Sequence, residues 1–155
     1  MADDAIVATT VTALPDEIAQ TFSGNMSVAP ADANDKWYYK LTSIPATSGD
    51  LIAGSFIDYT AVGAASSPTA ITTSDKVKFL FIQNQSTADG IMLCLDGGAA
   101  AFNLADGIFI GPSQTFTLRC PNTTVGNLHA ISSDEGSTGD AAVTAIVAAL
   151  IDDVA

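Results

Sequence analysis

The residue types that most often carry out chemistry in proteins are scarce in this 155-residue chain. Its single histidine, His129, lies between Leu128 and Ala130 in a β-prone run. A lone histidine acts as a general base only where the fold supplies a nucleophile and a group that orients the ring. The sequence contains no HExxH, GxSxG or P-loop motif. We therefore predict that the chain is not an enzyme and that His129 is structural or a surface residue.

The two cysteines, Cys94 and Cys120, lie in separate apolar runs, and neither has the CxxC or Cys/His spacing of a metal site. This pattern favours two reduced, buried thiols that act as small hydrophobic side chains. A disulfide between them stays open, because it depends on whether their strands adjoin. The N-terminus, MADDAIVATT, lacks the basic and long apolar regions of an export signal, so we expect folding in the reducing host cytoplasm.

Three acidic residues, Asp134, Glu135 and Asp140, share one glycine-containing loop that could place oxygen atoms around Ca²⁺. The loop lacks the alternating ligands and distant glutamate of an EF-hand. Gly136 and Gly139 supply turn chemistry by themselves, which favours a solvated hairpin tip. Whether the loop binds Ca²⁺ stays open, and with one histidine and two separated cysteines we expect no zinc and no other cofactor.

The charge of the chain is one-sided, with 17 acidic and 5 basic residues and a formal net charge of −12. Such a chain repels nucleic acid and anionic membrane surfaces, so neither is an expected partner. The longest apolar run, Ala141–Ile151, has 11 residues, whereas a membrane-spanning helix needs about 20. A mean hydropathy of +0.34 without a spanning segment suggests apolar surface buried between subunits.

The elements that would position these residues are short β-prone runs separated by turn clusters. At about eight to ten strands, with turn signals every 8–12 residues, the pattern predicts an all-β, antiparallel β-sandwich, jelly roll or barrel. The expected strands are Ala5–Ala13, Lys36–Ser43, Leu51–Val62, Val77–Ile82, Ile91–Leu95, Ile108–Gly111, Phe116–Arg119, Leu128–Ser132 and Ala141–Leu150.

The segments between these runs are predicted as connections. The runs at 77–82 and 91–95 have only a short polar link, which indicates an antiparallel hairpin. Pro15 and the acids after it suit a single helical turn within Leu14–Phe22. Loops are predicted at Ser23–Asn34, Gly63–Thr69 and Pro121–Asn127.

The predicted organisation is an N-terminal arm and loop over residues 1–35 and one β-sandwich domain over residues 36–155. The small, uncharged stretch at 63–69 is the best internal boundary, and we interpret it as a loop between sheets.

Two stretches are candidate interfaces. The uncharged Ala5–Leu14 segment, with Ile6, Val7 and Val11, suits an arm that adds a strand to a neighbour's sheet, or an ordinary first strand. Trp37, Tyr38 and Tyr39 are consecutive aromatics. Either Trp37 and Tyr39 face the core with Tyr38 at the surface, or this strand forms an intersubunit contact, where Trp and Tyr concentrate.

The C-terminal half resembles a known protein type. The stretches VKFLFIQNQSTADGIMLCLDGG, FNLADGIFIGPSQTFTLRCPNTTVGNLHAIS and AAVTAIVAAL, within Lys76–Leu150, are similar to head decoration (cement) proteins of tailed phages and related virion proteins. The resemblance implies a β-sandwich or jelly roll, commonly trimeric, bound to the outer capsid surface between major capsid proteins. It implies no catalytic residues.

We therefore expect a non-enzymatic capsid decoration protein at the capsid surface of a virion, with the major capsid protein and further copies of itself, as a homotrimer, as partners. The alternatives are a phage tail, fibre or other virion subunit, or a glycan-binding β-sandwich that uses the aromatic cluster at Trp37.

Overall fold

The computed structural model describes residues 4–13, 20–56, 69–101, 107–134, 137–138 and 141–154. The chain divides into two compact units, residues 1–33 and residues 34–155. The described part contains eleven β-strands and a single turn of 3₁₀-helix, and all paired strands are antiparallel. The predicted all-β, antiparallel fold class is confirmed.

The first unit is a two-stranded hairpin of β1 (Ala5–Ala13) and β2 (Gln20–Val28). The predicted loop at Ser23–Asn34 is wrong over its first half, because residues 23–28 continue β2 opposite β1. Apolar Met26 and Val28 alternate there with polar neighbours, which suits a strand with one apolar side. The predicted helical turn that begins at Pro15 lies outside the described residues, and residues 20–22 at the end of that stretch belong to β2.

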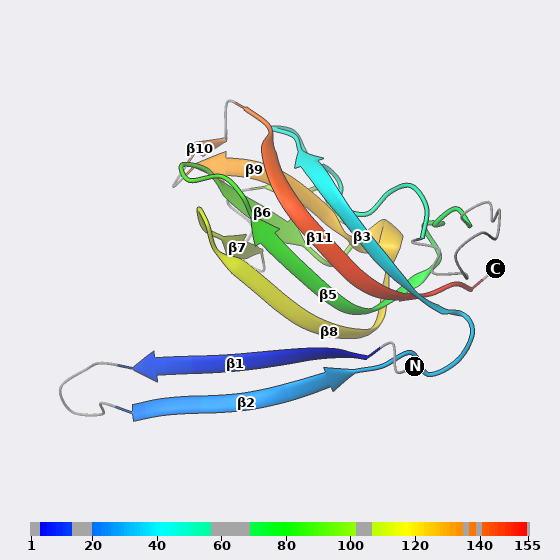
Figure 1. Cartoon of the computed structure of the whole chain (residues 1–155). Helices are drawn as coiled ribbons and strands as arrows, with labels where there is room; N and C mark the ends of the chain where they lie inside the picture. The colour runs from blue at the N-terminus through cyan, green and yellow to red at the C-terminus, as the bar shows by residue number, and fades with distance from the viewer. Residues whose placement is uncertain are drawn as a thin grey trace, which may run out of the picture. The chain divides into compact units, whose positions relative to one another are not determined.

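The second unit contains two sheets, which Figure 1 shows as two facing layers. The four-stranded sheet has the strand order β3 (Asp35–Ile44), β11 (Val143–Asp152), β5 (Lys76–Asn84), β8 (Thr115–Thr124). The five-stranded sheet has the order β10 (Ser137–Thr138), β9 (His129–Asp134), β6 (Gly90–Cys94), β7 (Ile108–Ile110), and β4 (Gly49–Asp50) also pairs with β9. This arrangement is a β-sandwich.

In the second unit, strands near the start of the sequence pair with strands near its end, and strands nearer the middle pair with each other. β3 pairs with β11, β4 with β9, β5 with β8, and β6 with β7. These four pairs are nested, as in one long hairpin rolled into two layers. Strands β5 and β11 also pair, as do β6 and β9, which joins neighbouring pairs into continuous sheets.

The predicted hairpin between residues 77–82 and 91–95 is wrong, because β5 and β6 lie in opposite sheets. The link between them turns around the buried side chain of Asn84. Its Nδ2 donates to the carbonyl oxygens of Asp89 at 2.8 Å and Gly111 at 3.0 Å, and its Oδ1 accepts from the N–H of Ser86 at 2.9 Å. Strands β5 and β6 are each apolar on both sides. Each can therefore be buried in a different sheet of the sandwich.

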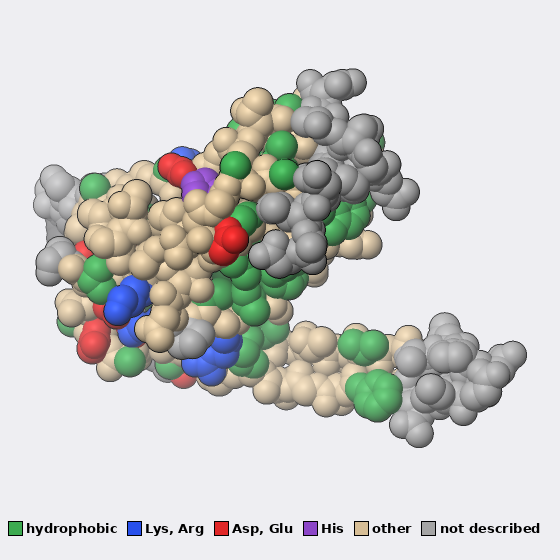
Figure 2. Space-filling model, turned by 180° about the vertical axis from the view of Figure 1, so that it is seen from behind, with side chains coloured by type: hydrophobic (Ala, Val, Ile, Leu, Met, Phe, Trp, Pro, Cys, Tyr) green, Lys and Arg blue, Asp and Glu red, His purple; other side chains and the backbone are tan. Residues whose placement is uncertain are grey.

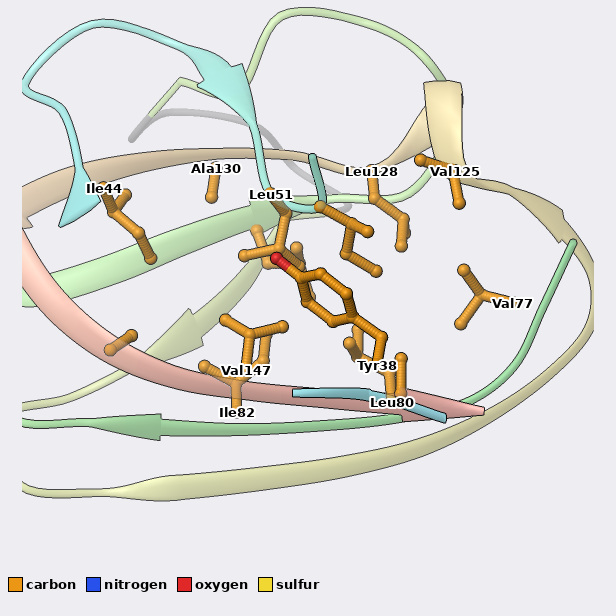
Figure 3. Close-up of a cluster of buried hydrophobic side chains, with 14 of the residues drawn as sticks. Tyr38, Ile44, Leu51, Val77, Leu80, Ile82, Val125, Leu128, Ala130 and Val147 are labelled. Atoms are coloured by element: carbon orange, nitrogen blue, oxygen red, sulfur yellow. The ribbon is translucent and has the colours of Figure 1, made fainter. Parts of the chain in front are cut away.

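The hydrophobic core lies between the two sheets. Leu80 and Ile82 of β5 and Val147 of β11 face Leu128 and Ala130 from the other layer (Figure 3). The ring of Tyr38 extends from β3 into this space, and its hydroxyl donates to the carbonyl oxygen of Ala53 at 3.4 Å. The 3₁₀-helix, Val125–Asn127, contributes Val125 to the same core.

Two further element predictions need correction. Residues 51–56 form no long strand but an irregular segment with one isolated bridge between Ser55 and Ala70, and Leu51, Ile52 and Phe56 are nevertheless buried. Residues 57–62 of that prediction lie outside the described residues. The predicted loop at Pro121–Asn127 is instead the end of β8 followed by the 3₁₀-helix. Pro121 is tolerated because β8 is an edge strand with an irregular register at this point.

The predicted closing strand is confirmed as β11, which lies between β3 and β5 in its sheet. The predicted loop at 63–69 falls almost entirely outside the described residues, and so do residues 102–106 of the connection between β6 and β7.

Candidate interaction surface

The outer side of the four-stranded sheet is an apolar surface that faces away from the core. The registers of β3, β11, β5 and β8 place its side chains in three rows of four. We call these residues the apolar sheet face: Trp37, Leu150, Phe79 and Arg119; Tyr39, Ala148, Phe81 and Thr117; Leu41, Ile146, Gln83 and Thr115. Eight of the twelve are apolar or aromatic.

The most accessible part of this face belongs to the edge strand β3. The side chains of Tyr39 and Leu41 are 56% and 62% exposed. Leu150 and Phe79 in the first row are buried, and the Trp37 ring meets the Phe79 ring edge-on, with 6.3 Å between centroids. The face is therefore well packed at one end and open at the other.

The charges on this face are unlike those of the chain as a whole. The chain carries 17 acidic residues, yet none of the twelve face residues is acidic and Arg119 is the one charged member. At the average acidic content of the chain, 17 of 155 residues, twelve residues would include about one carboxylate, and the next pair beyond the first row on the same side is Asp35 and Asp152. Charge-poor, apolar surfaces with exposed aromatic side chains are typical of protein–protein interfaces.

An ion-pair cluster lies at the end of the same sheet. Nζ of Lys78 is 2.6 Å from Oδ1 of Asp35 and 3.6 Å from Oδ2 of Asp152. The Asp35 side chain is fully buried, so its negative charge requires this partner. The cluster keeps two carboxylates that border the face paired with a lysine.

The predicted aromatic cluster is split by the sheet. Trp37 and Tyr39 lie on the apolar sheet face, half-buried and exposed respectively, whereas Tyr38 is buried in the core. The interpretation with Trp37 and Tyr39 in the core and Tyr38 outside is therefore wrong. Tyr38 lies opposite Ala149, which is also buried, so both side chains are on the core side of the sheet.

Burial also affects the acidity of Tyr38. Desolvation of the phenol raises its pKa, and the hydrogen bond with the Ala53 carbonyl offsets only part of this increase. Tyr38 is consequently a neutral core residue at physiological pH and is not available to an interface.

The face also includes residues that sequence reasoning missed: Leu41, Phe81 and Ile146. Leu41 has the same alternation phase as Tyr39, and Phe81 belongs to a strand that is apolar on both sides. These two patterns can be recognised in the sequence. The order of the strands in the sheet, which brings the residues together, cannot be recognised there.

A second apolar surface lies on the hairpin of the first unit. The β1–β2 register places Val7 and Met26, and Val11 and Phe22, as facing pairs on one side. We call this side the apolar hairpin face. The other side carries mainly Ser, Thr and Asn. Val11 and Phe22 are 53% and 54% exposed, and Val7 is half-buried.

The predicted arm residues are thus divided between the two sides of the hairpin. Val7 and Val11 share the apolar hairpin face, whereas Ile6, 76% exposed, lies on the polar side. Neither strand contains a charged residue, and Figure 2 shows the hairpin with apolar and uncharged side chains only. Met26 was missed because residues 23–34 were interpreted as a loop, and Phe22 because it ends the stretch 14–22, in which a helical turn was predicted.

The residues with potential for chemistry do not form a catalytic or metal site in the described part of the chain. Nε2 of His129 lies 3.4 Å from Oδ1 of Asp50 on the neighbouring strand β4. Within the described ranges, no three His, Cys, Asp or Glu side chains are grouped as metal ligands. The acidic loop prediction stays open, because Glu135 and Asp140 lie outside those ranges.

The two cysteines are free, buried thiols in different sheets. The Sγ of Cys94 donates to Oδ1 of Asp96 at 2.8 Å, and this hydrogen bond together with the N–H of Gly98 lowers the pKa of Asp96. Desolvation raises the pKa of the Cys120 thiol. Cys120 therefore acts as a small apolar side chain, whereas the thiol of Cys94 is a hydrogen-bond donor to Asp96.

Among the residues that the structure describes, no helix has the length and hydropathy of a membrane span. No protein-family model matches the chain, and no curated protein or solved structure matches it either.

Proposed function

We propose that the chain is a non-enzymatic virion structural protein that decorates the outer surface of a phage capsid between major capsid proteins. The observation that carries this proposal is the apolar sheet face, which lacks acidic residues in a chain of net charge −12. A subunit with such a face is suited to permanent burial in an assembly, because obligate interfaces are apolar and poor in charge.

The order of the strands supports the same proposal. Four nested pairs, β3–β11, β4–β9, β5–β8 and β6–β7, distributed over two sheets, are the arrangement expected of a jelly roll. We therefore propose the jelly roll as the finer description of the sandwich. This fold and the sequence resemblance over residues 76–150 both favour a virion protein, with trimers as the assembled form.

The mechanism of a decoration protein is mechanical. Burial of apolar surface contributes about 25 cal/mol per Å² before the costs of association, so each contact stabilises the shell in proportion to the exposed apolar area that it covers. Repeated over a shell, such contacts oppose the separation of neighbouring capsid proteins. The acidic remainder of the surface keeps the unbound protein soluble.

The test compares phage particles that contain the protein with particles whose gene for it has been deleted. Deleted particles are expected to release their DNA at lower temperature and under milder osmotic shock, and added purified protein should restore resistance. The protein should be present in high copy number over the head. Equal resistance of both particle types, or a few copies confined to the tail, would contradict decoration.

A glycan-binding module or fibre subunit is the second candidate, and exposed Tyr39 beside Trp37 is the observation that favours it. Aromatic rings on an open sheet face are available for contact with another molecule. Binding of the purified chain to a glycan array, lost in Trp37→Ala and retained in Val154→Ser, would support this alternative over decoration.

A further inference from the structure

We propose that copies of this chain join through their two apolar surfaces, with the apolar hairpin face of one copy lying on the apolar sheet face of a second copy. This inference deepens the proposed function, since it names the surfaces through which the subunits assemble. It rests on three independent features of the described residues: the sidedness of the hairpin, the charges of the two surfaces, and their areas.

The hairpin has the pattern of an element that requires a partner. Its two nine-residue strands form a sheet of their own, and a two-stranded hairpin is marginally stable by itself in water. One side is apolar and the other polar, so only one side gains from burial. Yet Val11 and Phe22, a directly facing pair on the apolar side, are each more than half exposed. An apolar surface of matching shape would bury this pair.

The charges favour a second copy as that partner. Two molecules of net charge −12 repel each other, and this repulsion is weakest for contacts that bring no carboxylates together. The hairpin strands contain no charged residue, and the apolar sheet face contains only Arg119. A contact between these two surfaces therefore places no acidic side chain opposite another. It also requires no ion pair to be buried and desolvated.

The two apolar surfaces together come closer to the area of a stable interface than either surface does alone. The sheet face, with three rows on four strands, covers about 19 Å by about 20 Å, or roughly 400 Å² in projection. One side of the hairpin covers about 10 Å by about 30 Å, or roughly 300 Å². A stable interface buries about 800 Å² on each partner, so a reciprocal pair, in which each of two copies places its hairpin on the sheet face of the other, approaches this size.

The experiment measures self-association of the full-length chain by sedimentation velocity over a concentration series. The hairpin variant is Val11→Ser/Phe22→Ser, and the sheet-face variant is Tyr39→Ser/Leu41→Ser. Each should raise the dissociation constant by at least about tenfold. Matched controls replace exposed apolar side chains outside both surfaces: Ile6→Ser, on the polar side of the same hairpin, and Val154→Ser. Both controls should associate like the unmodified chain.

A mixing experiment identifies which surfaces touch. The hairpin variant keeps an intact sheet face, and the sheet-face variant keeps an intact hairpin. The two variants should therefore form a mixed pair, although each alone stays monomeric. All four substituted positions are exposed, and unchanged thermal unfolding of each variant checks that it is folded.

Three results would overturn the inference: an unmodified chain that stays monomeric up to its solubility limit, association that survives in the hairpin variant, or failure of the two variants to pair. Association that survives in the hairpin variant but not in the sheet-face variant would indicate contact between two sheet faces. Binding to capsids is measured separately, so a monomer that still protects capsids would overturn this inference and leave the proposed function standing.

Discussion

Single residues in this chain matter most where a charge or a polar group is buried. The clearest case is Asp35, whose side chain is fully buried at the start of β3 and is held 2.6 Å from Lys78 of β5. The pair joins two strands that are not neighbours in the sheet, since β11 lies between them. Such a pair contributes little net stability when intact, but its disruption is costly.

We predict that Lys78→Met lowers the free energy of unfolding by about 3 kcal/mol, because it leaves the buried Asp35 carboxylate without its cation. The double variant Asp35→Leu/Lys78→Met should recover most of this loss, since it removes the unpaired charge as well. Urea unfolding followed by tryptophan fluorescence measures both. A loss below about 1 kcal/mol in the single variant would mean that water solvates Asp35.

Tyr38 gives the chain a specific response to alkaline pH. Burial raises its pKa in the folded state above that in the unfolded state, so the folded chain holds the phenol proton more tightly. The corresponding stability is complete below about pH 10, the unfolded pKa, and is lost as the pH rises through the higher folded pKa. Stability should therefore fall above about pH 10 more steeply in the unmodified chain than in Tyr38→Phe. Parallel curves for the two proteins would refute the assignment.

At the scale of elements, the sequence pattern predicted well which residues form strands, but it predicted poorly which strands pair with each other. The alternation in KVKFLFIQN and the β-branched residues of VTAIVAALID indicate strands, and both are strands. The same local signals placed β5 and β6 in one hairpin, but the structure separates them into two sheets. The reason is that Asn84, Ser86 and the Gly111 carbonyl form a buried hydrogen-bond network between distant segments. Such a network leaves no local pattern.

The candidate interaction surface could likewise be predicted only in part from the sequence. Exposed aromatic residues in β3 could be recognised from the sequence, but their phase could not, because Trp37, Tyr38 and Tyr39 are all suitable for either side. The side that enters the core depends on the pairing with β11, whose partner residues Ala148 and Ala149 are 109 or more residues away in the sequence. The hairpin strand β2 was missed because Gly24, Asn25 and Ser27 resemble a loop, although Asn25 and Ser27 lie on the polar side of the hairpin.

At the scale of the whole molecule, the net charge of −12 opposes any assembly of like copies. Salt screens this repulsion, with a Debye length of about 30 Å at 0.01 M and about 8 Å at 0.15 M. Because the two proposed contact surfaces contain no ion pair that salt would weaken, we predict that self-association tightens as ionic strength rises over this range. Sedimentation at a series of NaCl concentrations measures the change. Weaker association at higher salt would instead indicate an interface held by opposite charges.

The nested pairing has a consequence for how the chain is made. β11 lies between β3 and β5, yet it is the last of these strands to be synthesised. Until it leaves the ribosome, the two earlier strands have no common neighbour, and their edges stay open to the wrong partners. The contacts that complete the sheet join residues as far apart as Asp35 and Asp152, and folds dominated by such distant contacts form slowly. The nascent chain therefore has to stay unaggregated until β11 has been made, and its many carboxylates provide the repulsion that can keep it so.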